Sequence, residues 1–391
     1  MIRNKTTLRI QDVIILFGIL FSAAVGLLDM SVNKIALYVV LPFIFCMTFL
    51  SRRSLLTNRY MNTLTMLFVW ILISVLWATS VKHAMVQVKQ IMGAFILCYI
   101  YSVQGTQKDS LPWLYTSFLV ILLGDWYYAY NHMFDVLDLG VDRLDDKRLN
   151  ANTFAYHTFY ATFATFILGE LNIKVKRIMR MLFFLMIPLS FVTAIFTASR
   201  QVFVIQVPLI LLLLHGRYFK YKSLKVKVIS ILFLLVSAMT CLPKVMEVYN
   251  DSKLKERNSI EIKEDGRILL LKDAIRIGND HFPLGVGANN FVVYSYNKGF
   301  SHNTYLELYV NEGIIGVSIY IYLMLSFIIT QWKRYRRTKD LMYYYFLLAG
   351  IFFAVDGFFY VFYPYLWLIG FFILISTHSE CYYKNNKVYM L

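Results

Sequence analysis

Long apolar runs separated by short polar segments most constrain how this chain can fold. Runs of about 17–25 apolar residues are long enough to cross a bilayer as a helix. Since 59% of the residues are hydrophobic, we predict an all-α polytopic membrane protein with about 12 transmembrane helices in a single integral membrane domain over residues 1–391. The twelve runs lie near residues 12–28, 35–50, 61–77, 91–104, 111–131, 152–171, 180–198, 201–215, 226–243, 304–331, 341–360 and 362–378.

The basic residues predict which side of the membrane each loop faces. Lys and Arg concentrate in alternate short loops, at residues 52–59, 174–180, 217–227 and 333–339. Because short cytoplasmic loops carry an excess of these residues, we expect both termini in the cytoplasm. The net charge of +16 is thereby explained by topology, so we expect no nucleic-acid partner. The basic N-terminal segment lacks a small-residue cleavage site, which favours a retained first helix.

Two segments on the expected outer side are long, at residues 132–151 and 244–303. We interpret the first as an external loop. Apolar residues of the second recur at the spacing of a short amphipathic helix on the outer membrane surface. These residues are Ile268, Leu271, Ile275 and Gly278. Pro283 and the glycines after it predict a turn that leads the chain back to Ser301.

Charged side chains within apolar runs are the first candidates for function, since charge at membrane depth is costly. On the predicted topology we interpret them as the lining of a polar cavity open to the outside; pairing with each other or with backbone is the alternative. They are Asp125, Arg200, Glu307, Glu312 and Asp356. His302 stands at the mouth of this cavity, where an imidazole could accept a proton from a hydroxyl. A helix cap or polar anchor is the other interpretation of His302.

Arginines on the same side suit an anionic ligand, because the guanidinium fork matches phosphate oxygens. Arg200 ends the segment TASR between two apolar runs, where contact with lipid headgroups is the alternative. Arg267 and Arg276 belong to the expected external helix, and a solvated helix face is the alternative, more so for Arg276. No zinc spacing, phosphate-binding loop or dinucleotide glycine pattern occurs, so we expect no metal and no cofactor.

Several short motifs follow one another across residues 150–330. They are NANTFA from Asn150, TASR ending at Arg200, GR at Gly266–Arg267, PLGVGANNF from Pro283, and HN followed after nine residues by GIIG, from His302 to Gly316. In this order they resemble the signature of the O-antigen ligase and O-antigen polymerase family of bacterial envelope polysaccharide proteins. The resemblance is specific over residues 150–330, while the N-terminal helices match only in hydrophobicity and spacing.

This resemblance implies a glycosyltransferase that moves a glycan from undecaprenyl pyrophosphate to an acceptor hydroxyl, on the outer face of the bacterial cytoplasmic membrane. It implies that His302 activates the acceptor and that Arg200 and Arg267 bind the pyrophosphate, with no metal and no nucleotide sugar. We add Arg276 and Asn303 as expected binding residues. The expected cavity residues are Asn152, Glu307, Glu312 and Asp356.

The acceptor decides between two enzymes of this type. We expect a polymerase of capsular, exo- or O-antigen repeat units, because nothing in the chain is dedicated to a lipid A partner; a ligase that uses lipid A core is the alternative. A transporter or flippase would concentrate charge at mid-membrane in two related halves, and a structural scaffold is the weakest alternative. The expected partners are the lipid-linked oligosaccharide and membrane lipids, together with a flippase and a chain-length regulator of the same pathway.

Overall fold

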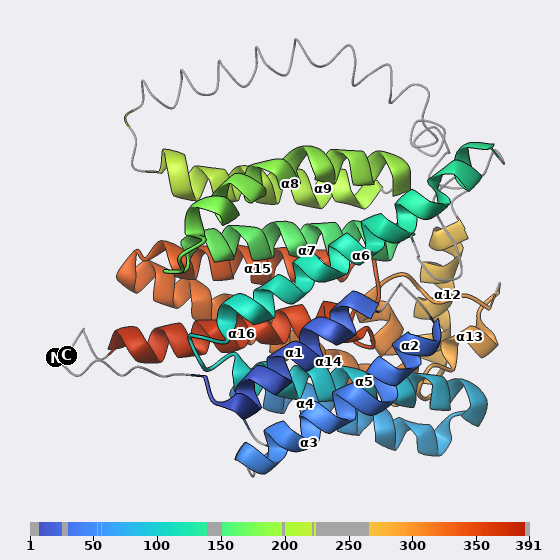
Figure 1. Ribbon diagram of the computed structural model, residues 1–391. Coiled ribbons are helices and arrows are strands. Elements are labelled where there is room, and N and C mark those ends of the chain that lie inside the picture. The colour runs from blue at the N-terminus through green and yellow to red at the C-terminus, as the bar shows by residue number, and fades with distance from the viewer. Residues whose placement is uncertain are drawn as a thin grey trace.

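The computed structural model describes residues 8–25, 30–52, 54–55, 57–138, 151–197, 200–220, 223, 266–296 and 298–387. Within these residues every regular element is a helix, and the long helices lie side by side in one bundle (Figure 1). The first half contains α1 (Ile10–Val25), α2 (Met30–Ile35), η1 (Ala36–Val40), α3 (Leu41–Arg52), α4 (Arg59–Ser74), η2 (Val75–Trp77), α5 (Val81–Gln104), α6 (Leu111–Asp138) and α7 (Ala151–Glu170). The second half contains α8 (Lys176–Thr197), α9 (Arg200–Leu214), η3 (His215–Phe219), α12 (Gly266–Asp280), α13 (Phe291–Tyr294), α14 (Thr304–Thr338), α15 (Leu341–Asp356) and α16 (Leu366–Lys387).

Several of these helices have the length and composition of membrane spans. The four that are long and apolar enough are Val32–Ser51, Arg59–Trp77, Val81–Gln104 and Thr304–Thr338, while α1 and α15 are shorter apolar helices. The all-α, multi-pass fold is therefore confirmed. Every predicted apolar run coincides with a described helix except the run at residues 226–243, which lies outside the described residues. The number of spans and the cytoplasmic position of the termini stay predictions.

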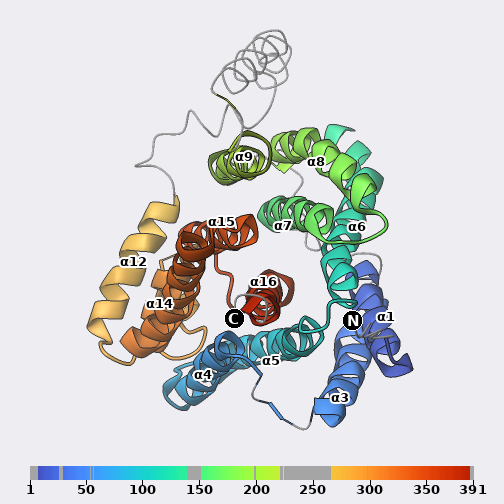
Figure 2. The same ribbon diagram turned by 90° about the vertical axis from the view of Figure 1, so that its left-hand side faces the viewer.

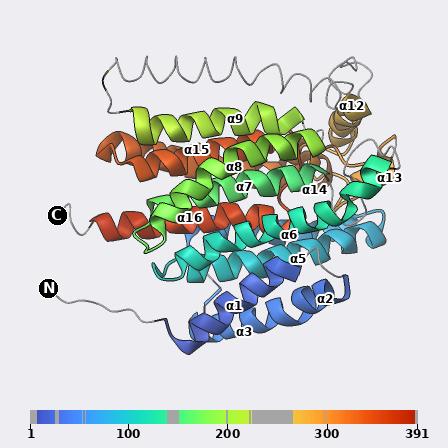
Figure 3. The ribbon, with the colours of Figure 1, turned by 45° about the horizontal axis from the view of Figure 1, so that its top comes forward.

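The last helix, α16, occupies the middle of the bundle. Viewed along the helices, it lies among α4, α5, α7 and α15 (Figure 2). Aromatic rings fill this centre, where Phe371 of α16 lies 4.3 Å from Tyr160 of α7 and 5.1 Å from Phe118 of α6, measured between ring centroids. The start of α1 and the end of α16 lie at one end of the bundle, and α12 and α13 lie at the opposite end (Figure 3).

The helix α12 lies across the end of the bundle, steeply inclined to the long helices (Figure 1). The predicted amphipathic helix is therefore present, but its buried face differs from the prediction. The buried residues are Leu270, Ala274, Ile277 and Gly278, whereas Ile275 is 47% exposed. The reason is the packing of α12 on α14: a Cβ atom at Gly278 would lie 2.5 Å from the ring of Tyr309.

Two other boundaries differ from the prediction. The helix α5 begins at Val81, well before residue 91, because Gln87 in its second turn is buried against other polar groups and does not interrupt the helix. The helix α6 continues to Asp138, so residues 132–138 are not part of the predicted external loop at 132–151. The rest of that loop and residues 244–265 of the longer segment lie outside the described residues.

Candidate active site

The turn Ser301–Asn303 leads directly into α14 and holds His302 in a left-handed backbone conformation, with φ of 55°. Asn303 caps the helix, since its Oδ1 accepts hydrogen bonds from the backbone N–H groups of Tyr305 (2.9 Å) and Leu306 (3.0 Å). Asparagine is among the best residues for this position. The half-buried ring of His302 lies 4.2 Å from the ring of Phe300 between centroids. The HN pair thus combines a helix cap with a histidine fixed just before the helix.

Glu307, one turn into α14, holds this histidine-bearing turn from behind. Its carboxylate accepts a hydrogen bond from the backbone N–H of Ser301 (2.7 Å) and another from Nδ2 of Asn311 (3.0 Å). The side chain is buried, and within the described part of the chain no cation lies at ion-pair distance from it. Its two hydrogen bonds are therefore its main compensation for burial.

A break in α14 follows at Gly313, where φ is 67° and ψ is −164°. Backbone groups freed by this break bond to the loop after α12. Val286 and Gly287 donate to the carbonyls of Val310 and Asn311 (both 2.8 Å), and Ile314 donates to the carbonyl of Pro283 (3.0 Å). Because a Cβ atom on Gly313 would lie 2.0 Å from that Pro283 oxygen, only glycine fits here. The loop and the broken helix thus complete each other's hydrogen bonds.

The same loop is fixed on its other side by the turn between α4 and α5. Asn290 accepts a hydrogen bond from the backbone N–H of Ser80 (2.6 Å), and Asn289 donates to the carbonyl of His83 (3.1 Å). The backbone N–H of Phe291 donates to Oδ1 of Asn311 (2.8 Å), which continues the network that includes Glu307. These contacts explain physically why PLGVGANNF and the segment ending in GIIG occur together.

Behind the histidine-bearing turn lies the segment that joins α15 to α16. Thr304 donates from its backbone N–H to the carbonyl of Gly357 (2.7 Å) and from Oγ1 to the carbonyl of Tyr360 (2.6 Å). Asp356 immediately precedes this segment and is fully buried. Neither of its carboxylate oxygens has a hydrogen-bond partner in the described part of the chain. A buried polar group of this kind marks a place where a ligand or water can bind.

The predicted arginines have different surroundings. Arg267 is the second residue of α12, is half-buried, and acts electrostatically on the hydroxyl of Tyr156 in α7. Arg276 is 62% exposed in its side chain and pairs with two carboxylates of its own helix, Asp273 (3.1 Å) and Asp280 (3.8 Å). Arg200 is the first residue of α9, and its side chain lies outside the described residues. Arg267 is therefore half-buried, whereas Arg276 lies on the surface.

A second buried polar cluster surrounds the carboxylate of Glu312, at the break in α14. Its Oε1 accepts a hydrogen bond from Gln87 (3.2 Å), whose amide also donates to the hydroxyl of Tyr363 (2.8 Å). Trp70 donates to the backbone carbonyl of Glu312 (2.8 Å). The sequence showed no signal for Gln87 or Trp70, because a lone polar or aromatic residue in an apolar run has no pattern that assigns its partner. The remaining predicted cavity residue, Asn152, is buried in the first turn of α7.

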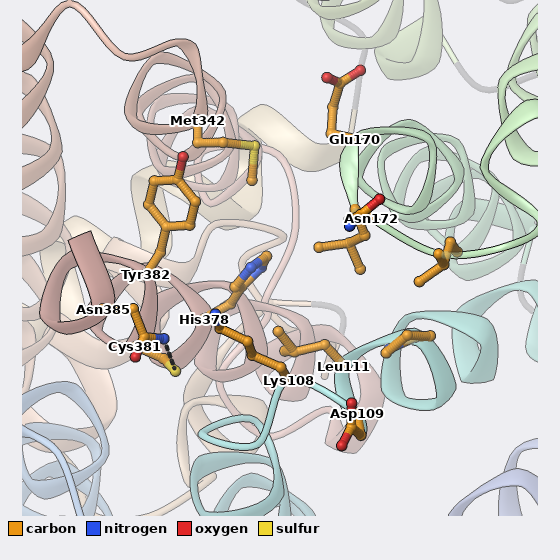
Figure 4. A pocket seen from close by; sticks show the side chains of 13 residues that line it. Lys108, Asp109, Leu111, Glu170, Asn172, Met342, His378, Cys381, Tyr382 and Asn385 are labelled. Carbon is orange, nitrogen blue, oxygen red and sulfur yellow. Dashed lines mark hydrogen bonds between the residues drawn. The ribbon is translucent and has the colours of Figure 1, made fainter. Parts of the chain in front are cut away.

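A cavity of about 560 Å³ opens at the opposite end of the bundle, where α1 begins and α16 ends. Polar and apolar side chains line it together, among them Lys108, Glu170, Met342, His378 and Cys381 (Figure 4). Some of its polar groups have local partners: Nδ1 of His378 lies 3.0 Å from the hydroxyl of Tyr115, and Asn385 donates to Sγ of Cys381 (3.4 Å). The predicted site residues do not line this cavity.

The described residues provide no candidate site for a metal ion. Among the described residues no three His, Cys, Asp or Glu side chains are grouped closely enough to hold an ion. The expectation that the protein works without a metal stays a prediction.

Fold and site together define a multi-pass, all-α membrane protein with a polar, histidine-bearing turn at one end of an apolar bundle. Residues 181–321 match the family model described as O-antigen ligase, which confirms the resemblance seen in the motifs. The match extends from α8 past the break in α14 and includes Arg200, Arg267 and His302. No curated protein matches the chain.

Proposed function

We propose that this chain transfers a glycan from undecaprenyl pyrophosphate to an acceptor hydroxyl on the outer face of the bacterial cytoplasmic membrane. The reaction would polymerise repeat units of a capsular, exo- or O-antigen polysaccharide. The observation that carries the proposal is the fixed turn: hydrogen bonds of Glu307 and Asn303 hold His302 at the polar end of an apolar bundle. Arg267 lies on the neighbouring helix α12, and the family match supports the reaction class.

The proposed step needs one base and one set of cations. His302 accepts the proton of the acceptor hydroxyl as the hydroxyl oxygen bonds to the anomeric carbon of the donor sugar. The bond from that carbon to the phosphate oxygen breaks, and its electron pair leaves with the pyrophosphate. Arg200 and Arg267 stabilise this departing anion. Since the leaving group is already activated, alignment of donor and acceptor supplies much of the remaining catalysis.

The purified full-length protein and a lipid-linked repeat unit test the proposal. We expect the wild-type protein to form a ladder of glycan lengths and the variant His302→Ala to form none while still folding in detergent. The matched control is His215→Ala, because His215 is an exposed histidine at the other end of the bundle. A normal ladder from His302→Ala would exclude the proposed base.

A ligase is the second candidate, favoured by the description of the matching family model. Adding lipid A core to the same assay separates the two. A ligase would transfer one preformed glycan to lipid A core and form no ladder with the repeat unit alone. Absence of transfer with either acceptor, together with movement of the lipid-linked unit across a vesicle membrane, would favour the transporter alternative.

A further inference from the structure

A second histidine forms a buried pair between α6 and α7, apart from the turn of His302. Nδ1 of His157 lies 2.7 Å from Oδ2 of Asp125. Asp125 is fully buried, and its Oδ1 has no hydrogen-bond partner among the described residues. His157 is the group that pairs with Asp125 at ion-pair distance in the described part of the chain. A carboxylate buried in an apolar bundle is costly without compensation, so the two residues act as one unit.

Charge neutrality decides which atoms of His157 carry hydrogen. If the shared proton lies on Nδ1, Asp125 is a carboxylate and the ring is an imidazolium with a hydrogen on Nε2. If the shared proton lies on Asp125, the neutral ring carries its hydrogen on Nε2. Nε2 loses its hydrogen only when the pair becomes a buried net anion, which the low-dielectric surroundings disfavour. In either neutral form His157 therefore presents an N–H donor.

The face of α7 that carries His157 contacts the segment behind the histidine-bearing turn. From Asn152 to Gly169 every residue of α7 is buried except Thr153 and His157, which lie one turn apart on the same face. The hydroxyl of Thr153 lies 3.1 Å from that of Tyr360. The carbonyl of Tyr360 in turn accepts hydrogen bonds from the first residue of α14, Thr304. Nε2 of His157 has no hydrogen-bond partner in the described part of the chain.

A cation acts on the adjacent position of α7. The residue before His157 is Tyr156, and Arg267 acts electrostatically on its hydroxyl. A guanidinium thus acts on the residue of α7 next to the one that carries the N–H donor. Phosphate oxygens are the acceptors that such a combination suits, since hydrogen bonds to an anion are stronger than those to a neutral group.

We infer that His157, held by Asp125, donates a hydrogen bond from Nε2 to a phosphate oxygen of the polyprenyl pyrophosphate. The inference rests on the proposed function, which supplies that ligand. His302 serves the acceptor hydroxyl, whereas His157 serves the departing group. Negative charge grows on the phosphate oxygen as the glycosidic bond breaks, and the N–H contact strengthens with it. The hydrogen stays on His157 throughout the step.

Two substitutions of His157 distinguish the effect of its N–H donor from the effect of its side-chain bulk. His157→Gln keeps an N–H donor of similar reach, and His157→Met keeps side-chain bulk without a donor. Binding of undecaprenyl pyrophosphate to the full-length protein in nanodiscs is the measurement. We expect His157→Met to weaken binding about 10-fold or more and His157→Gln to weaken it about 3-fold or less. His215→Met is the control and should bind as the wild type does.

A second measurement uses the wild-type protein and does not depend on the folding of His157→Met. In ¹⁵N spectra of histidine-labelled protein, the Nε2 resonance that is missing in His157→Gln should shift when undecaprenyl pyrophosphate is added. An unshifted resonance, or wild-type affinity in folded His157→Met, would overturn the inference. Failure of the wild-type protein itself to bind the pyrophosphate would instead contradict the donor of the proposed function.

Discussion

Oε2 of Glu307 accepts a hydrogen bond from the backbone N–H of Ser301, with 2.7 Å between oxygen and nitrogen. A carboxylate inside α14 therefore holds the turn that precedes the same helix. The second oxygen accepts from Asn311, whose own Oδ1 accepts from the backbone N–H of Phe291. Each acceptor in this series of hydrogen bonds faces a donor. The direction of the network therefore depends on Glu307 having two acceptor oxygens and no donor, and we propose that Glu307 positions His302.

Glu307→Gln should lower the transfer rate more than the affinity for the donor lipid. The glutamine can accept from Ser301 only by turning its NH₂ toward the NH₂ of Asn311, and a flip of Asn311 would set its NH₂ against the N–H of Phe291. We expect kcat to fall about 10-fold, because one buried hydrogen bond to a charged group is lost. The KM for the lipid-linked donor should change little in steady-state assays.

Glu380→Gln is the matched control, since Glu380 pairs with Arg59 and Arg334 away from the turn. Its transfer rate should equal that of the wild type. A wild-type kcat in Glu307→Gln would show that the position of His302 does not depend on this carboxylate.

Gly313→Ala should prevent stable folding of the break in α14. The added methyl group would collide with the Pro283 carbonyl, and the backbone angle there is unfavourable for residues other than glycine. We expect a large fall in melting temperature in detergent. Gly93→Ala is the control, because its Cβ atom would meet only Leu366 at an ordinary 3.5 Å. Equal melting temperatures for the two variants would contradict this view of the break.

Asn303 should act chiefly as the N-cap of α14. Asn303→Ala removes the acceptor for two backbone N–H groups and should cost about 1 kcal/mol of stability. Asn303→Asp keeps the acceptor and should restore most of the melting temperature. A carboxylate at a pyrophosphate site would also repel the ligand. A raised donor KM in Asn303→Asp would therefore support the binding role expected from the sequence, and an unchanged KM would leave only the cap.

Arg267 and Arg276 should differ in their effect on donor binding. Arg267→Ala removes a half-buried cation that acts on Tyr156 of α7, so we expect the donor KM to rise about 10-fold. Arg276→Ala removes an exposed side chain already paired with Asp273 and Asp280, and its KM should stay near the wild-type value. The two variants form a matched pair on one helix. A larger effect from Arg276→Ala would show that its carboxylate partners release it to the substrate.

Transfer should persist in excess EDTA. The resemblance implies a metal-free reaction, and a pyrophosphate leaving group stabilised by arginines can depart without a divalent ion. The measurement is the glycan ladder before and after chelation. Loss of the ladder in EDTA and its return with one added divalent ion would contradict the metal-free step.

Hydropathy predicted the helices well where one residue pattern decides the outcome. The runs at 111–131 and 341–360 coincide with α6 and α15, because a long apolar run has few alternatives to a helix in a membrane. Prediction was weaker where polar residues are buried. Gln87 lies inside α5 but outside the predicted run, since its burial depends on Glu312 and Tyr363, which are distant in the sequence.

By itself, the sequence determined the helical class, the order of the motifs and the identity of His302 as the candidate base. The length of an apolar run and the residue types of a motif are local properties, so the sequence alone reveals them. Only the tertiary structure decided that the PLGVGANNF loop fills the break at Gly313, that Glu307 holds the histidine-bearing turn, and that His157 pairs with Asp125. Each of these is a hydrogen bond or ion pair across helices, and its existence depends on how buried backbone and side-chain groups find partners once the bundle has packed.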